Sequence, residues 1–310
     1  MKETGKSVCI AIENHSQLGS QVSSSSGWFL APWILSALAV STAVRTVAAG
    51  SDLQTGAVAQ PDTRYGLCGL LDTCSLHGQG AVPEPFIVDD TDLEINEVRF
   101  DWLHFKSQGE HNDVFSGEIE KGFGPVTVEV RVPYEYDFAD GVPTRGFDEV
   151  ELGIRTPVYQ YVSPDESVDS TFGIGFETGI PTNSTLSKNT ELVPKIFNDL
   201  RLGDHFTLQS LLGCSALLGS GEQGGQRTLE YGFVFGYSID RKQLPIPGVF
   251  RVIPVFELSG ETGLAGASKR TSLTADAAIR ADLKSIGTIQ PRLGIGYVFP
   301  VNNDARQNLP

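Results

Sequence analysis

The side chains in this sequence that can act as a nucleophile, a base or a metal ligand do not group into a catalytic or metal-binding set. A lipid-hydrolysing site on a strand needs a histidine and a serine on one face, with a polar third partner. His205 is followed on its face by Thr207 instead, so this match fails. No two of the five histidines have metal-ligand spacing on one strand face; they are His15, His77, His104, His111 and His205. We therefore predict that the protein is not an enzyme and needs no cofactor and no metal.

Three other segments contain residue types that bind ligands or form crosslinks in other proteins. Residues 219–225 (GSGEQGG) lack the Lys-Ser/Thr pair of a phosphate-binding loop, which predicts a flexible loop. The acidic residues from Asp89 to Glu94 can bind calcium, but a solvated acidic turn is the favoured interpretation. Cys68 and Cys74 have neither haem-attachment nor zinc spacing. In an oxidising compartment these two cysteines can close a small disulfide loop.

The chain is acidic, with a formal net charge of −15 over 310 residues. Residues 1–59 contain as many basic as acidic residues, so the whole excess lies in the rest of the chain. Nucleic-acid binding needs a basic surface, so we predict no nucleic-acid partner. Two interpretations of the acidity stay open. It is either a solvated exterior, or an acidic channel interior and loops that disfavour anions.

The first 59 residues predict a leader with a signal peptide. Residues 28–44 (WFLAPWILSALAVSTAV) are an apolar run, and the small residues at 47–49 and 57–59 resemble signal-peptidase sites. An uncleaved membrane anchor is the alternative, but a long apolar helix would retain the chain in the inner membrane. Residues 60–92 contain Gly, Pro and Asp without periodicity, which predicts an irregular lead-in that is periplasmic or exposed.

The elements that must position any functional residue are strands. From Val126 to Tyr136, valine and tyrosine alternate with polar residues, so one face of a strand is apolar and the other is charged. The run is about as long as the ~9–11 residues that a tilted strand needs to cross a bilayer. Tyrosine at one end of an apolar face is typical of a membrane–water boundary.

Eleven segments of this kind follow one another between residues 93 and 300. Bacterial outer-membrane barrels close with an even number of strands. We therefore predict an all-β, transmembrane, antiparallel up-and-down β-barrel of about twelve strands over 93–300, with ten as the alternative and a tail at 301–310. The missing strand is expected near 93–121. Prolines within the strands predict bulges or strand ends at Pro133, Pro157, Pro254 and Pro291.

A soluble β-sandwich gives the same alternation, because its apolar stripes face inward instead of outward. The placement of the aromatic residues, the leader and the scarcity of helical patterning favour the membrane barrel. In hydrocarbon the strands must pair with one another to satisfy their backbone groups. The polar faces then line an enclosed lumen, with these predicted lining residues: Glu129, Arg131, Glu149, Glu151, Arg155, Glu177, Glu230, Arg280 and Arg292. If these acids and arginines pair with one another, they can also fill the lumen.

Several motifs resemble a known family. Residues 85–90 (PFIVDD) are similar to the entry motif of a family of bacterial outer-membrane barrels described as phenol-degradation meta-pathway-like or simply as transporters. Further similar motifs are FDEVELGIRTPV (147–158), FGIGFETGIPT (172–182), TLEYGFVFGYSI (228–239) and IQPRLGIGYVF (289–299). The resemblance covers roughly residues 85–300. Val88 stands where the family tends to have threonine, and PVNNDARQNLP follows the final aromatic, Phe299.

The resemblance implies a porin-like protein of the bacterial outer membrane that transports small molecules passively, among them hydrophobic or aromatic ones. Its expected partners are the lipid bilayer, a small-molecule solute and the outer-membrane insertion machinery. A glycine-rich last strand ending in an aromatic resembles the signal that this machinery recognises, although Phe299 is not terminal here. The alternative is a structural or adhesive barrel that conducts nothing.

Overall fold

The fold comes from a computed structural model of the chain. The described residues are 11–14, 82–89, 91, 96–107, 110–123, 126–139, 142–219, 223–265, 269–284, 286 and 291–308. The apolar run of the predicted leader and the Cys68–Cys74 pair lie outside them. Of the charged run from Asp89 to Glu94, the structure describes Asp89 and Thr91.

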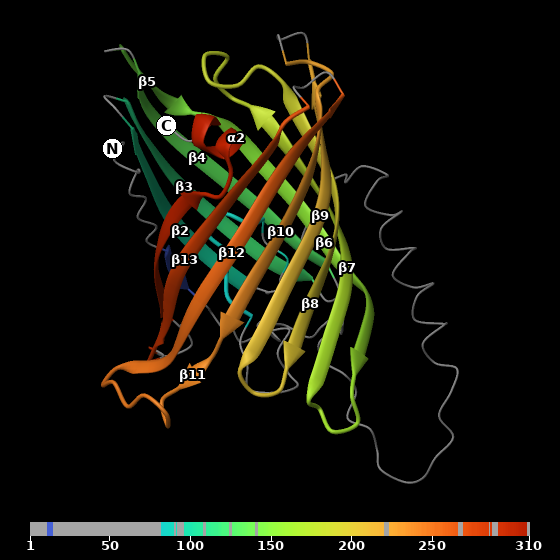
Figure 1. Ribbon diagram of the computed structural model, residues 1–310, viewed down its shortest axis with the longest axis vertical. Helices are drawn as coiled ribbons and strands as arrows, with labels where there is room; N and C mark the ends of the chain where they lie inside the picture. The colour runs from blue at the N-terminus through green and yellow to red at the C-terminus, as the bar shows by residue number, and fades with distance from the viewer. Residues whose placement is uncertain are drawn as a thin grey trace, which may run out of the picture.

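The described residues form one sheet of fourteen strands and one short helix (Figure 1). The strands are β1 (Ala11–Asn14), β2 (Asn96–Ser107), β3 (Glu110–Phe123), β4 (Val126–Ala139), β5 (Val142–Phe147), β6 (Glu149–Val162), β7 (Val168–Pro181), β8 (Thr190–Leu202), β9 (Phe206–Leu218), β10 (Arg227–Tyr237), β11 (Ile239–Asp240), β12 (Val249–Ala265), β13 (Thr271–Leu283) and β14 (Pro291–Pro300). The helix is α2 (Asn303–Asn308). The all-β prediction is therefore confirmed.

The sheet is an up-and-down meander in which every pairing is antiparallel. The strands lie in chain order from β2 to β14, with β5 and β11 as side branches on β4 and β12. β5 and β6 pair successive parts of β4 and together form one long strand interrupted at Asp148, whose N–H donates to the Pro133 carbonyl at 3.2 Å. β10 and β11 likewise pair successive parts of β12. This merging gives eleven long strands, which correspond to the eleven segments predicted from the sequence.

The residues that the structure describes near 93–121 do not form the additional strand expected there. Within 96–107 and 110–123 the chain forms the single hairpin β2–β3, from Asn96 opposite Lys121 to Ser107 opposite Glu110. The remaining strand on the path is β1, which pairs with β14 from Ala11 opposite Gly294 to Asn14 opposite Pro291. β1 also contacts β2.

The four prolines lie at irregular positions of the sheet, as predicted. Pro133 on β4 faces the interruption between β5 and β6, and Pro254 on β12 faces the interruption between β10 and β11. The register shifts between Pro157 and Tyr159, and Pro291 is the first residue of β14. On their other sides, Pro133 opposite Ser116 and Pro254 opposite Ile279 belong to ladders without a shift, so each missing donor interrupts the pairing on one side only.

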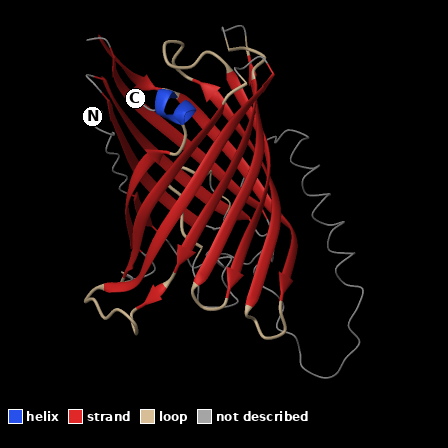
Figure 2. Cartoon of the chain, viewed as in Figure 1, coloured by secondary structure: helices blue, strands red, loops and turns tan. Residues whose placement is uncertain are grey.

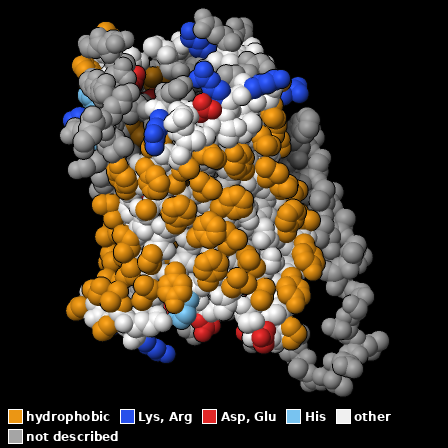
Figure 3. Space-filling view, in the orientation of Figure 1, with side chains coloured by type: hydrophobic (Ala, Val, Ile, Leu, Met, Phe, Trp, Pro, Cys, Tyr) orange, Lys and Arg blue, Asp and Glu red, His pale blue; other side chains and the backbone are white. Residues whose placement is uncertain are grey.

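The two faces of the sheet have opposite chemistry. In β4, Val128 and Val130 are exposed, whereas Thr127 and Glu129 are buried. Among the residues that the structure describes, thirty-five large hydrophobic side chains are exposed, while twenty-five polar or charged residues are buried. Figure 3 shows the exposed apolar side chains as a broad belt, with Lys, Arg, Asp and Glu above and below it.

The sheet curls into a half-barrel, with α2 close to one of its ends (Figure 2). The curvature follows from the right-handed twist that strands adopt and from glycines that let them bend. Within the described part of the chain, no helix has both the length and the apolar composition to cross a membrane.

Candidate functional site

The predicted lining residues lie on the polar, concave side of the sheet, and none of the nine is exposed. Glu129, Arg155 and Arg280 are buried, and the other six are intermediate. Because neighbouring strands present these side chains at matching heights, most of them meet an opposite charge across the sheet. The sequence located the residues on this face, but it did not identify their partners.

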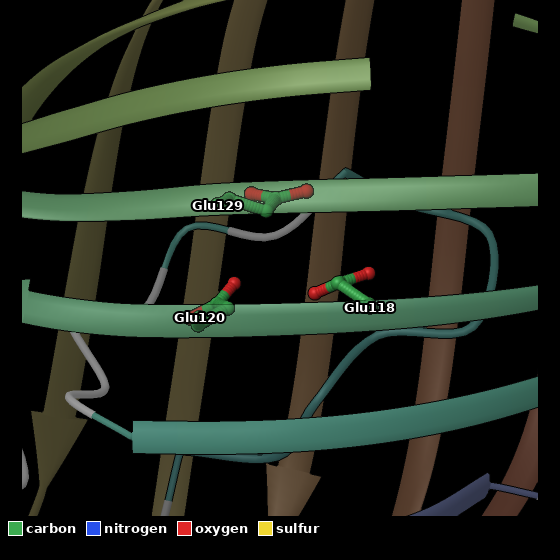
Figure 4. A group of neighbouring side chains, drawn as sticks. All are labelled: Glu118, Glu120 and Glu129. Atoms are coloured by element: carbon green, nitrogen blue, oxygen red, sulfur yellow. The ribbon is translucent and has the colours of Figure 1, made fainter. Parts of the chain in front are cut away.

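One cluster joins β3, β4 and β6. Glu118 and Glu120 project from β3 and Glu129 projects from β4 into the same space (Figure 4), with carboxylate oxygens within 4.8 Å of one another. Arg155 forms ion pairs with Glu120 and, at 3.2 Å, with Glu129. Arg131 lies 4.0 Å from Glu118. Three carboxylates are a conceivable cation site, but the two guanidinium groups already supply the positive charge, so we interpret the group as an ion-pair cluster.

A second cluster centres on Lys195 of β8, whose side chain is buried. Its ammonium group contacts the carboxylates of Glu177 on β7 and of Asp89, which precedes β2. An isolated buried ammonium is costly, and two acidic partners compensate for its lost hydration. Asp89, considered above as a calcium ligand, is thus engaged by a lysine.

Asp89 belongs to a segment that lies on the concave side of the sheet. We call Val82–Asp89 together with Thr91 the inner segment. Val82, Phe86 and Val88 are buried, and Glu84 and Thr91 are 1% and 0% exposed. The prediction that residues 60–92 form an exposed lead-in is therefore wrong for this part. The segment is irregular, as predicted, but the curved sheet surrounds it (Figure 1).

The carboxylate of Glu257 on β12 binds the backbone of the inner segment. The N–H of Phe86 donates to its Oε1 at 2.7 Å. The N–H groups of Ile87 and Val88 donate to its Oε2 at 2.9 and 3.1 Å. Glu257 is 0% exposed. Three charge-assisted hydrogen bonds to one carboxylate both fix the conformation of these residues and satisfy the buried charge.

The backbone carbonyls of the inner segment are bound by wall side chains as well. Arg280 donates to the Pro85 oxygen at 3.0 Å, and Arg99 donates to the same atom. Gln209 donates to the carbonyl of Pro83. Each of these bonds replaces a strand partner that the irregular backbone lacks.

Side chains of the inner segment complete the attachment. Glu84 lies 3.6 Å from both Arg99 and Arg292. The Thr91 hydroxyl lies 2.7 Å from the carboxylate of Asp199 and 2.7 Å from the amide oxygen of Gln209. The segment is therefore attached to β2, β8, β9 and β14 in addition to β12 and β13.

The apolar side chains of the inner segment fit against glycines and a small apolar patch. The ring of Phe86 packs under the guanidinium of Arg280, 4.1 Å from centroid to Cζ. A Cβ on Gly294 would lie 2.5 Å from the Phe86 ring, and a Cβ on Gly232 would lie 2.4 Å from a Val88 methyl group. Val88 packs with Val234, Ile253 and Val255, which are buried on the same side. Glycines on the polar face were visible in the sequence, but nothing local indicated which segment they accommodate.

Two of the histidines that the structure describes, His205 and His104, have polar partners of an ordinary kind. His205 lies 3.4 Å from the amide of Gln243 and beside the Tyr237 ring. Sequence reasoning missed the contact of His104 with Asp113 at 2.8 Å, which joins neighbouring strands β2 and β3. The prediction that the protein is not an enzyme stays a prediction.

Comparison with known proteins adds no further evidence. The chain matches no protein-family model, no curated protein and no solved structure. The resemblance of its motifs to the phenol-degradation meta-pathway-like barrels therefore stays a prediction. The function has to be argued from the sheet, its charged concave face and the inner segment.

Proposed function

We propose that the chain is a bacterial outer-membrane β-barrel that passes small molecules passively between the two sides of the membrane. The observation that carries this proposal is the inverted distribution of side chains, with polar residues buried and large hydrophobic ones exposed. A soluble sandwich has the opposite distribution. The apolar belt in Figure 3 and the charges beyond both of its edges support a bilayer as the surrounding medium.

The free energy needed to expose these apolar side chains to water favours a membrane as the surrounding medium. Burying a large apolar side chain is worth roughly 1.5–3 kcal/mol. Thirty-five such side chains are exposed among the described residues. Even at half of that value each, their exposure to water would forgo tens of kcal/mol, more than the ~5–15 kcal/mol stability of a typical domain. Contact with lipid removes this penalty.

The strand count supports a closed barrel of twelve strands. Ten antiparallel steps separate β2 from β14, so these two strands run in the same direction and cannot pair antiparallel with each other. One strand antiparallel to both is required between them, and β1 lies at that position, paired with β14 and in contact with β2. We propose that a strand at this position closes the sheet.

β1 also lies within the predicted leader. Cleavage after residue 49 or residue 59 would remove Ala11–Asn14. Mass spectrometry of the N-terminus of the mature protein tests both the closing role of β1 and the cleavage of the predicted leader. Retention of these residues supports β1 as the closing strand, whereas their loss assigns that role to another strand and supports the leader.

The proposed solute is small and hydrophobic or aromatic. This class is implied by the motif resemblance at residues 85–90 and in the later strands. The acidity of the chain, −15 overall, supports the exclusion of anions from the path. The expected partners are the bilayer, the solute and the insertion machinery, which would recognise the glycine-rich β14 that ends near Phe299.

The second candidate is a structural barrel that conducts nothing. A specific observation favours it, because the inner segment and the ion-pair clusters occupy the concave side of the sheet. Both candidates place the protein in the outer membrane. They differ only in whether solute can pass.

Two measurements test these proposals in turn. Cell fractionation followed by gel electrophoresis with and without boiling should find the protein in the outer membrane and show heat-dependent mobility, since closed barrels resist detergent until heated. Extraction without detergent would instead indicate a soluble β-sandwich. Planar-bilayer recordings of the purified protein then separate a channel from a scaffold, with boiled protein as the control.

A further inference from the structure

The inner segment is attached in a way that leaves the sheet complete without it. Its backbone takes no place in the ladder from β2 to β14. Its backbone is bound by the side chains of Glu257, Arg280, Arg99 and Gln209. If the segment left, every strand pairing would persist, and water would replace the lost bonds on both sides. A departure therefore costs only local contacts.

The contacts of the inner segment are spread across the whole width of the curved sheet. Glu84 reaches Arg99 on β2 and Arg292 on β14, Asp89 reaches Lys195 on β8, and the segment's backbone reaches β12 and β13. A chain that bridges opposite walls in this manner blocks the space between them. Solute cannot take the same path while the segment is bound.

From this geometry we propose that the inner segment is a releasable plug, and that solute passes only when it leaves the Glu257 carboxylate. This inference rests on the proposed channel function and names its gate. Glu257 is the main attachment point, because one buried carboxylate accepts three backbone N–H bonds from consecutive residues. Gly232 and Gly294 form the two recesses that accept Val88 and Phe86 when the plug is bound.

A reversible crosslink tests the proposal directly. A Cβ on Gly232 would lie 3.2 Å from the Cβ of Val88, close to the ~3.5–4.5 Å that disulfides span. The variant V88C/G232C, with Cys9, Cys68, Cys74 and Cys214 replaced by serine, should therefore form one disulfide that holds the plug on β10.

The matched control crosslinks the wall alone. Thr262 and Thr271 lie opposite each other on β12 and β13, with hydroxyl oxygens 3.0 Å apart. T262C/T271C in the same cysteine-free background carries a disulfide that leaves the plug free. Heat-dependent gel mobility verifies that each variant is folded before it is recorded.

The readout is potassium chloride conductance across planar bilayers, with oxidised and reduced protein compared in the same membrane. We expect oxidised V88C/G232C to lose its conductance and regain it on reduction, while T262C/T271C conducts equally in both states. We also expect E257A to raise the open fraction about tenfold, because it removes three charge-assisted bonds. E257Q, which keeps one acceptor oxygen, should fall between E257A and the unsubstituted protein.

The contrary outcomes are distinguishable. Equal conductance of oxidised and reduced V88C/G232C, with the disulfide verified by mass, overturns the plug and leaves the channel proposal intact. An unchanged open fraction in folded E257A also overturns it. Absence of conductance in every folded variant, E257A included, overturns both the plug and the channel and favours the structural barrel.

Discussion

Replacement of Arg155 by methionine should lower the free energy of unfolding, because Arg155 is the cation of a buried ion-pair cluster. Arg155 is 1% exposed and pairs with Glu120 and Glu129, which are 2% and 4% exposed. Methionine keeps most of the side-chain volume but removes the charge. Two buried carboxylates then lose their guanidinium partner, and removal of one member of a buried pair costs about 3–5 kcal/mol.

The assay is urea unfolding of the protein in lipid vesicles, followed by tryptophan fluorescence. R155M should lower the free energy of unfolding by about 3–5 kcal/mol. The triple variant R155M/E120Q/E129Q should recover most of this loss, because neutral amides no longer need a cation. A loss below about 1 kcal/mol in R155M, or no recovery in the triple variant, would refute the assignment of this cluster as a buried ion-pair network.

The remaining predictions concern the outer face and one turn. Ile196 lies at the middle of β8 and is 42% exposed. In a bilayer, Ile196→Arg should therefore lower the free energy of unfolding by about 2–4 kcal/mol, whereas Ile196→Leu should be nearly neutral. An equal effect of the two substitutions on unfolding in vesicles would contradict lipid contact. Hydrogen bonds from Ser163 and Ser167 lower the pKa of the Asp165 carboxyl in the β6–β7 turn. A carboxyl group whose pKa is lower in the folded than in the unfolded protein stabilises the folded protein at pH values above the unfolded pKa. This contribution to stability is lost as the pH falls through the folded pKa. Carboxyl NMR titration should find a lower pKa for Asp165 folded than unfolded, and equal values would contradict the turn geometry.

The strands could be predicted because their signal is local. The alternation from Val126 to Tyr136 needs no knowledge of the rest of the chain, and it reappears as β4 with Val128 exposed and Glu129 buried. The number of segments was right for the same reason. The expected extra strand near 93–121 was wrong, because an even strand count is a global property that no segment encodes.

The inner segment could not be predicted, because its burial depends on the surrounding sheet. Phe86, Ile87 and Val88 are consecutive apolar residues without strand or helix periodicity, and such a run is compatible with an exposed loop. Their partner Glu257 is 170 or so positions away in the chain. Arg155 and Glu120 are similarly 35 residues apart. Only the strand register brings these pairs together, and register needs tertiary structure.

The central claim is that the apolar outer face contacts lipid, and cysteine labelling in vesicles tests it most directly. Ile174, at the middle of β7, is 42% exposed, and Lys242 is exposed in the turn after β11. In a cysteine-free background, a water-soluble maleimide should label K242C rapidly and leave I174C unmodified until the protein is denatured. Equal labelling of the two in the folded protein would contradict the account, because it would mean that water covers the apolar belt.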